Sequence, residues 1–420
     1  MQNFFNLEGW RYVLMGLDIL LTLAPIWLPI LLIWVAATLY MRYIRLKYLQ
    51  EREFDLLEIK LPEDIRKTPE AMELIYTALY LKSTPTLYKV FVNGEVIPWF
   101  SLELVSIGGK IHFFIRTDSK HTRIVKAQIY AQYPEAEIYE VPDYTNFVDV
   151  DSADIDMWGT YFQQTDEDVK PIKTYVDYNL DKPGVKPEEQ TNPITSMLEY
   201  LGNLNRGEQV WIQILIRGHK AWDWKTGNTL LKKTEWKDKV DKEIDSVVKE
   251  AKKTEEGKEL LLPYLEPGKD DYIKSLRRQQ AKIPFEVAIR GLYIAEKDVF
   301  EGVSIVGLIG SLRQYNYHDA NGFKLGYWTD VSEFEKNVDS IFGMEKYVER
   351  RKDKMKREFF EAYRLRSFFY PPYRYYEASP FILTTEELAT IYHFPGGVAQ
   401  TPTFKRLDAK KGEPPSDLPT

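Results

Sequence analysis

The chain has 420 residues, of which 28% are charged and 44% are apolar, the composition of a globular protein rather than a disordered one. It contains no cysteine, which excludes thiolate catalysis, disulfides and cysteine-based zinc or iron–sulfur sites. Its formal net charge of −7 argues against wholesale electrostatic binding of nucleic acid, so any such contact would have to be local and weak or indirect.

The N-terminal part of the chain contains an uncharged apolar run, residues 19–40. As a helix it would extend about 33 Å, which is enough to cross a hydrocarbon core about 30 Å thick. Only Arg11 precedes the run, whereas four basic residues follow it: Arg42, Arg45, Lys47 and Arg52. Since Lys and Arg stay preferentially on the cytoplasmic side, we expect a single-pass protein of the inner membrane with most of the chain in the cytoplasm. Residues 1–18 would then form an interfacial segment.

A cleaved signal peptide is the competing interpretation of this run. Glu8 and Asp18 in the leading segment, the length of the run and the lack of a clear small-x-small cleavage site argue against it. Pro25 and Pro29 would kink the helix or mark an interfacial segment, because each removes a backbone donor.

Residues 41–145 are expected to form a first folded unit. Thr68 followed by Pro69 is a helix-start signal, and Gly108-Gly109 suits the tight turn of a β-hairpin. The expected elements are, in chain order, strand 57–61, helix 69–82, strand 99–107, strand 110–116, helix 118–133 and strand 136–141. This β-α-β-β-α-β order most often folds as a ferredoxin-like sandwich.

Residues 146–330 repeat the pattern. Asn192 precedes Pro193 as Thr68 precedes Pro69. After one or two short strands, the expected elements are a helix from Pro193, strand 209–217, strand 284–295, helix 298–315 and strand 323–329. A charged insertion, residues 218–283, replaces the glycine turn, and its helical runs 230–253 and 272–281 predict a protruding helical hairpin.

Residues 331–420 are expected to form a helical arm and a Pro-rich tail. A helical pattern over 333–369 contains a basic segment, residues 349–357, which is usually a solvated helix face. The more specific alternative is a contact to nucleic acid or anionic lipid, which would use four residues: Arg350, Arg351, Lys354 and Arg357. Further on, Thr384 and Glu387 form a T-x-x-E capping box that opens a short helix.

The segment TEELATIYHFP, residues 385–395, followed by PPSDLP at 414–419, resembles the stretch just before the motor domain of membrane-anchored, TraG-like conjugative coupling ATPases. In that family a membrane helix and an α+β region precede the motor, so the overall layout is also similar. The specific motif similarity covers only about forty C-terminal residues. The resemblance implies a role in a type IV secretion-like or conjugative DNA-translocation system.

The chain departs from that family in lacking a P-loop, G-x-x-x-x-G-K-[ST]. Its Gly-Lys pairs, at Lys110, Lys258 and Lys269, are followed by Ile, Glu and Asp. No nucleotide-binding residue can therefore be carried over. We expect either that the motor is encoded separately and docks on this protein, or that the chain is a truncated coupling protein, and both make it an anchor and adaptor.

No catalytic, cofactor-binding or metal-binding residue is predicted. The five histidines, His112, His121, His219, His318 and His393, show no H-E-x-x-H or other ligand spacing, and no G-x-S-x-G nucleophile motif occurs. The carboxylates are abundant but scattered. Strand 110–116 would place His112 and Phe114 on one face for base stacking, but the glycine-aromatic signature of RNA-binding sheets is missing.

The sequence thus predicts an α+β protein with a single transmembrane helix, two ferredoxin-like (βαββαβ) units, the second with a charged helical insertion, and a C-terminal helical arm. Its expected role is a non-catalytic scaffold that docks a P-loop motor ATPase in trans and that could form a homo-oligomer. Residues expected to contact the motor are Glu386, Glu387, Tyr392, His393 and Phe394. The competing interpretation is that these residues pack on their own domain. A membrane-bound nucleic-acid receptor and an enzyme with an unrecognised site are the alternative functions.

Overall fold

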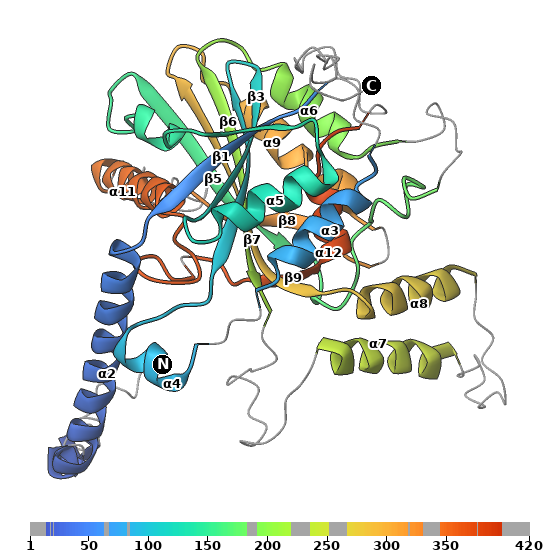
Figure 1. The fold of residues 1–420 in the computed structure, drawn as a ribbon. Helices are drawn as coiled ribbons and strands as arrows, with labels where there is room; N and C mark the ends of the chain where they lie inside the picture. Colours follow the sequence, from blue (N-terminus) through green and yellow to red (C-terminus); the bar gives the residue numbers. More distant parts are fainter. Residues whose placement is uncertain are drawn as a thin grey trace, which may run out of the picture. The chain divides into compact units, whose positions relative to one another are not determined.

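The computed structural model describes residues 14–16, 18–19, 21–62, 67–81, 85–182, 191–219, 236–251, 267–317, 320–330, 345–375 and 377–396. These residues form two compact units. The first unit takes its described residues from 1–52, 85–96 and 370–372, and the second takes all the others (Figure 1).

The first unit is built on the apolar N-terminal helix expected from the sequence, α2 (Ala24–Gln50). Its apolar side chains are exposed, and its length and composition would let it cross a membrane. A signal sequence has the same two properties. Pro25 lies in the first turn, where its missing N–H has no helical partner to lose, so it begins the helix rather than bending it. Pro29 lies inside the helix. A short helix, α4 (Leu87–Val92), packs beside α2.

The second unit is an α+β body around one sheet, which has nine strands in the described part of the chain. The strand order is β4-β1-β3-β2-β6-β7-β5-β8, with β9 beside β7, and all neighbouring strands pair antiparallel. The strands are β1 (Phe54–Lys60), β2 (Trp99–Ile107), β3 (Lys110–Asp118), β4 (Glu137–Glu140), β5 (Ile155–Gln164), β6 (Glu208–Gly218), β7 (Pro284–Glu296), β8 (Phe323–Trp328) and β9 (Phe381–Thr384). The predicted α+β class and the largely antiparallel sheet are confirmed.

Helices cover both faces of this sheet (Figure 1). The first face carries α3 (Glu70–Leu79), α5 (Thr122–Gln132), α6 (Ile194–Gly202), α9 (Gly302–Gly310) and α12 (Thr385–Ile391). The second face carries α11 (Glu345–Arg364). Two 3₁₀ turns, η1 (Tyr144–Phe147) and η3 (Arg313–Tyr315), complete the body.

The two halves of the sheet use the same pairing scheme. Counted outward from the centre, the first half runs β2, β3, β1, β4 and the second half runs β6, β7, β5, β8. When the strands of each half are numbered along the chain, both halves show the spatial order second, third, first, fourth. The halves join through β2 and β6, which pair from Trp99↔Arg217 to Ile107↔Gln209. One continuous sheet therefore runs through both expected units.

The turn and the insertion lie where the sequence placed them. Gly108 and Gly109 have φ values of +54° and +82° and join β2 to β3. Strands β6 and β7 pair from Glu208↔Ala295 to Gly218↔Phe285, and the insertion follows at the Gly218 end. Within it, α7 (Trp236–Ala251) and α8 (Pro267–Gln280) pack on each other. A small apolar cluster holds them against the body: Val169, Trp236, Val240, Leu276 and Ile382.

Helix α11, the long helix of the expected arm, packs on the body. Its Phe359 ring meets Tyr161 of β5 edge-on at 5.2 Å, and its Tyr363 ring lies 5.6 Å from Trp211 of β6. The Phe359 ring can approach β5 closely because residue 159 of that strand is glycine; a Cβ added to Gly159 would lie 2.5 Å from the Phe359 ring. The absence of a side chain at Gly159 thus sets how near α11 comes to the sheet.

Gly159→Ala should therefore destabilise the body by about 1–3 kcal/mol, because the Phe359 ring is held by Tyr161 and cannot move freely. Gly310→Ala is the matched control, since nothing lies within 4 Å of its added Cβ and alanine favours a helix. Unfolding of the full-length protein in detergent, followed by near-UV circular dichroism, measures both. Equal stability of the two variants would contradict the packing described for α11.

Candidate functional site

The segment expected to contact a motor, β9 and α12 with the residues that follow, is part of the body's interior. Strand β9 pairs with the first residues of β7, from Val287↔Phe381 to Pro284↔Thr384. Five residues were predicted as the contact site, and each is at most 2% exposed: Glu386, Glu387, Tyr392, His393 and Phe394. The two aromatic residues among them are therefore not exposed for a partner, because their rings cover the apolar first face of the sheet.

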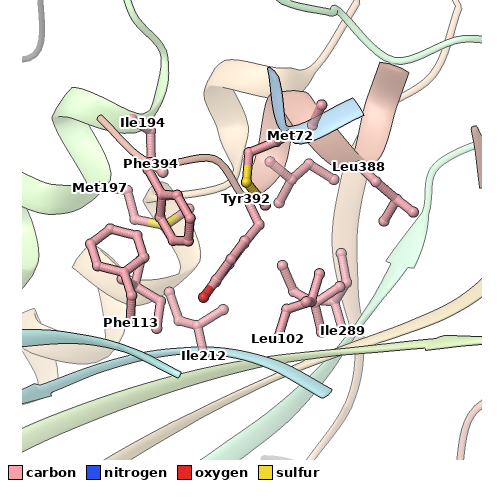
Figure 2. Packing of buried hydrophobic residues seen from close by; sticks show 14 of the residues in the cluster. Met72, Leu102, Phe113, Ile194, Met197, Ile212, Ile289, Leu388, Tyr392 and Phe394 are labelled. Atoms are coloured by element: carbon pink, nitrogen blue, oxygen red, sulfur yellow. The ribbon is translucent and has the colours of Figure 1, made fainter. Parts of the chain in front are cut away.

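Tyr392 and Phe394 lie at the centre of the core on this face. Figure 2 shows the Tyr392 ring pointing from the segment toward the sheet, with Phe394 nearby. The Tyr392 hydroxyl donates to the Phe114 carbonyl at 3.0 Å, and the Tyr76 hydroxyl donates to the Tyr392 carbonyl at 2.6 Å. The Phe394 ring meets Phe113 edge-on at 5.6 Å. The segment therefore bonds to both a strand and a helix of the first half.

Glu387 closes the capping box predicted from the sequence. Its carboxylate accepts from the Thr384 amide at 2.8 Å and from the Thr384 hydroxyl at 2.9 Å. The Ile172 amide donates to the same side chain at 3.2 Å. Burial raises the pKa of the Glu387 carboxyl to about 7, against the lowering effect of these donors. The box thus caps α12 and also fastens the loop that contains Ile172.

Glu386 links α12 to the charged insertion. Arg278 of α8 donates from Nε to Glu386 at 2.8 Å, and the Thr174 hydroxyl donates to the same carboxylate oxygen at 2.8 Å. Arg278 also pairs with Asp177 at 3.2 Å. Burial raises the pKa of Glu386, and the Arg278 charge opposes that rise. Lys282 adds a second link by pairing with Glu73 of α3.

His393 is held in a closed polar pocket. Its Nε2 lies 3.0 Å from the Asn192 amide oxygen, and its Nδ1 lies 3.2 Å from the Thr390 carbonyl. The same Asn192 oxygen accepts from the Ile194 amide at 3.1 Å and so caps α6. Burial lowers the pKa of His393 to about 4, so the ring is neutral at pH 7. All five predicted contact residues therefore have structural partners in the body, as the competing interpretation expected.

A second buried network, which the sequence analysis did not identify, lies on the other face of the sheet. Its centre is the fully buried pair Glu103 and Arg366, joined as a two-pronged fork with distances of 2.8 and 2.9 Å. Arg366 also donates to Asp143 at 3.1 Å, and the Tyr144 hydroxyl donates to Glu103 at 2.7 Å. Burial alone would raise the pKa of Glu103, but the charge and hydrogen bonds of Arg366 lower it to about 2.

The network continues sideways across three neighbouring strands. Glu103 of β2, Gln213 of β6 and Arg290 of β7 are in register with one another. The Gln213 amide donates to Glu103 at 2.9 Å and accepts from the Arg290 Nε at 2.7 Å. Arg290 is fully buried and also donates to the Tyr161 hydroxyl at 3.0 Å. A polar row thus crosses the junction between the two halves of the sheet.

A sequence signal for this row does exist. Each of the three residues has an apolar residue on either side in its strand, as Glu103 has Leu102 and Leu104 in WFSLELVSI. A lone polar residue in a strand buried on both faces needs a polar partner. The sequence could therefore have marked Glu103, Gln213 and Arg290 as partnered residues, but not which residues they contact.

The basic residues of α11 are exposed, with part of their charge used in ion pairs. Arg350, Arg351 and Lys354 are exposed, and Lys354 lies 3.8 Å from Glu358. Arg357 is exposed but pairs with Asp151 at 2.6 Å. The structure therefore places the four predicted residues on one helix, all of them exposed, with Arg357 in the shortest of these ion pairs.

A cavity of about 670 Å³ lies between α11 and the residues around the start of β5. Its wall has charges of both signs, including the ion pairs Arg357 with Asp151 and Lys356 with Asp156. No histidine lines it. Within the described part of the chain, no three His, Asp or Glu side chains are grouped to hold a metal ion.

No protein-family model matches the chain, and no curated protein matches it in sequence. Its function must therefore be inferred from its own residues.

Arg366→Met should destabilise the body by about 3–5 kcal/mol, because it leaves the Glu103 carboxylate buried without its charge partner. Adding Glu103→Gln should recover part of this loss, since a neutral amide can still bond to Gln213. Denaturant unfolding of the single variants and the double variant in detergent measures the coupling between the two residues. Additive losses would show that the pair does not act as a unit.

The pKa of His393 predicts a pH dependence of stability. In the unfolded chain a histidine takes up a proton near pH 6.5, whereas the buried ring stays neutral down to about pH 4. The unfolded state therefore binds more protons in this window, so this contribution to stability is complete above about pH 6.5 and falls as the pH is lowered. Between pH 7 and pH 5 the expected loss is about 2 kcal/mol.

His393→Gln should remove that loss. The measurement compares the free energy of unfolding at pH 7 and pH 5 for the natural chain and the variant. Glu387 contributes with the opposite sign, because its raised pKa favours the folded state at lower pH, so only the difference between the two proteins reports on His393. An unchanged pH dependence in the variant would contradict the assignment.

Proposed function

We propose that this protein is a single-pass inner-membrane scaffold of a type IV secretion-like or conjugative DNA-translocation system, whose cytoplasmic body docks a separately encoded P-loop ATPase. The observation that carries the proposal is the exposed apolar helix α2, joined to a large folded body. The basic residues that follow the apolar run support a cytoplasmic body, and the resemblance of residues 385–395 to coupling ATPases supports the type of system.

A scaffold role agrees with the way the body uses its polar residues. The buried charges Glu103, Arg366 and Glu386 bond to one another or to neighbouring groups of the fold, among them the half-buried Arg278. Groups used in this way hold elements together and are not poised to act on a substrate. An enzyme with an unrecognised site remains the alternative, for which no arrangement of acid, base and nucleophile in the described residues provides support.

We further propose that the two halves of the body are ferredoxin-like units arising from a duplication. The support is the shared element order and the shared pairing scheme, second-third-first-fourth from the centre outward. Joined through β2 and β6, two such units would present a wide, rigid platform to neighbouring subunits.

Purification of the tagged full-length protein in mild detergent, with mass spectrometry of the chains that co-purify, tests the scaffold. Recovery of a P-loop ATPase is the expected result. The matched variant ends after Gly396, because this cut leaves β9, α12 and the buried residues 392–394 in place. Loss of the ATPase from this variant would assign docking to residues 397–420, and retention would assign it to the body. Absence of any such ATPase from the full-length sample would overturn the proposal.

A local contact to nucleic acid is the second candidate, favoured by the exposed Arg350, Arg351 and Lys354 on α11. If it exists, the full-length protein should bind a single-stranded oligonucleotide with an affinity that falls as salt rises. Fluorescence anisotropy should show this binding weakened by Arg350→Glu with Arg351→Glu. The control is Lys120→Glu with Arg123→Glu, two exposed basic residues next to and within α5. Equal effects of both pairs would rule out a specific contact at α11.

A further inference from the structure

The short helix α4 of the first unit has an apolar surface that none of the described residues covers. Of its six residues, four are apolar and exposed. They are Leu87 at 70%, Tyr88 at 68%, Phe91 at 54% and Val92 at 48%. Large exposed apolar patches in a protein mark an interaction surface.

These four side chains share one side of the helix. At about 100° per residue, Leu87, Phe91, Tyr88 and Val92 fall within an arc of about 140°. Val90 and Lys89 each lie about 60° beyond one edge of this arc. Val90 is half-buried, whereas Lys89 is exposed and pairs with Glu95 at 3.5 Å. The exposed face of α4 is thus apolar with one lysine beside it, although the helix is only six residues long.

The turn after α4 fastens it to the backbone of α2. Gly94 has a φ of +68°, and a Cβ at this position would lie 2.4 Å from the Ile44 carbonyl oxygen. Only glycine allows both this backbone conformation and this close approach. The Glu95 amide also donates to the Lys89 carbonyl at 3.0 Å, which closes the turn. The height of α4 along α2 is therefore set at Ile44.

That height corresponds to the edge of a bilayer. The uncharged run ends at Tyr40, and Ile44 follows four residues later, which is about 6 Å along a helix. The headgroup region on each side of the hydrocarbon core is about 5–7 Å thick. Tyr40 and Tyr43 are exposed at this level of α2, and tyrosine is enriched at membrane interfaces.

We propose that α4 lies in the headgroup region of the same membrane that α2 crosses and inserts Leu87, Tyr88, Phe91 and Val92 toward the acyl chains. This inference rests on the proposed role of α2 as a membrane anchor. Lys89, at the edge of the apolar arc, then reaches the charged headgroups, as lysines beside apolar surfaces do. The occupant of the exposed face is lipid, because Gly94 places α4 beside α2 at Ile44, just after the exposed apolar run of α2 ends.

The absence of cysteine makes a direct test possible, since a single introduced cysteine can carry a spin label. Full-length variants Leu87→Cys and Phe91→Cys, reconstituted in vesicles of phosphatidylcholine and phosphatidylglycerol, report on α4. Both positions are exposed, so the label should not disturb packing. Leu31→Cys in α2 is the control for the anchor, and Val303→Cys, an exposed position of α9, is the control for water. Collision rates with oxygen and with a water-soluble nickel complex measure the surroundings of each label.

The expected result is that oxygen collisions exceed nickel collisions at Leu87 and Phe91, as at Leu31, and that the order reverses at Val303. If Leu31 is in lipid but Leu87 and Phe91 are in water, the inference about α4 is wrong and the anchor stands. If Leu31 is also in water, the anchor itself is wrong and the inference fails with it. Gly94→Val gives a second reading, because a side chain there would push against the α2 backbone and should move the Phe91 label toward water.

Discussion

The bidentate pair between Glu103 and Arg366 is the interaction on which the second face of the sheet depends. Glu103 lies on β2, at the seam where the two halves of the sheet meet, and Arg366 follows the end of α11. A carboxylate at this depth is tolerated only with a charge partner and further donors, and Arg366, Ser101, Tyr144 and Gln213 supply them. The seam, the helix and the η1 turn are therefore fixed by the same carboxylate.

The backbone of Arg366 shows how strongly this pair constrains the chain. Its φ of +49° is a left-handed conformation that residues other than glycine adopt at a cost of about 1–3 kcal/mol. Glycine is the usual residue at this position after a helix. Arginine occupies this position because its guanidinium pairs with the Glu103 carboxylate, and this bidentate ion pair offsets the backbone strain. Through this one residue, the C-terminal end of α11 is placed over the polar row rather than elsewhere on the sheet.

Local signals in the sequence predicted the local structure well. The uncharged run, the Gly108-Gly109 turn and the Thr384 capping box each act over a few neighbouring residues, and each corresponds to an observed feature. The joining of β2 to β6 could not be predicted, because it pairs residues more than one hundred positions apart with no turn between them. The position of Tyr392 was missed for a similar reason. A short capped helix followed by aromatics suits an exposed contact as well as a core, and only the Phe114 carbonyl and Tyr76 hydroxyl, both distant in sequence, distinguish the two.

The first unit is assembled from three separate parts of the chain, so α2 is not an isolated helix. Residues 85–96 leave the body between α3 and β2, and residues 370–372 do so after α11. Within the unit, Arg42 donates to the Pro372 carbonyl at 3.5 Å, and Gly94 rests on Ile44. Removal of residues 1–52 would therefore leave α4 without the helix it packs on, while its exposed apolar side chains stayed attached to the body. The first unit therefore depends on segments that lie between elements of the body in the sequence, and not on residues 1–52 alone.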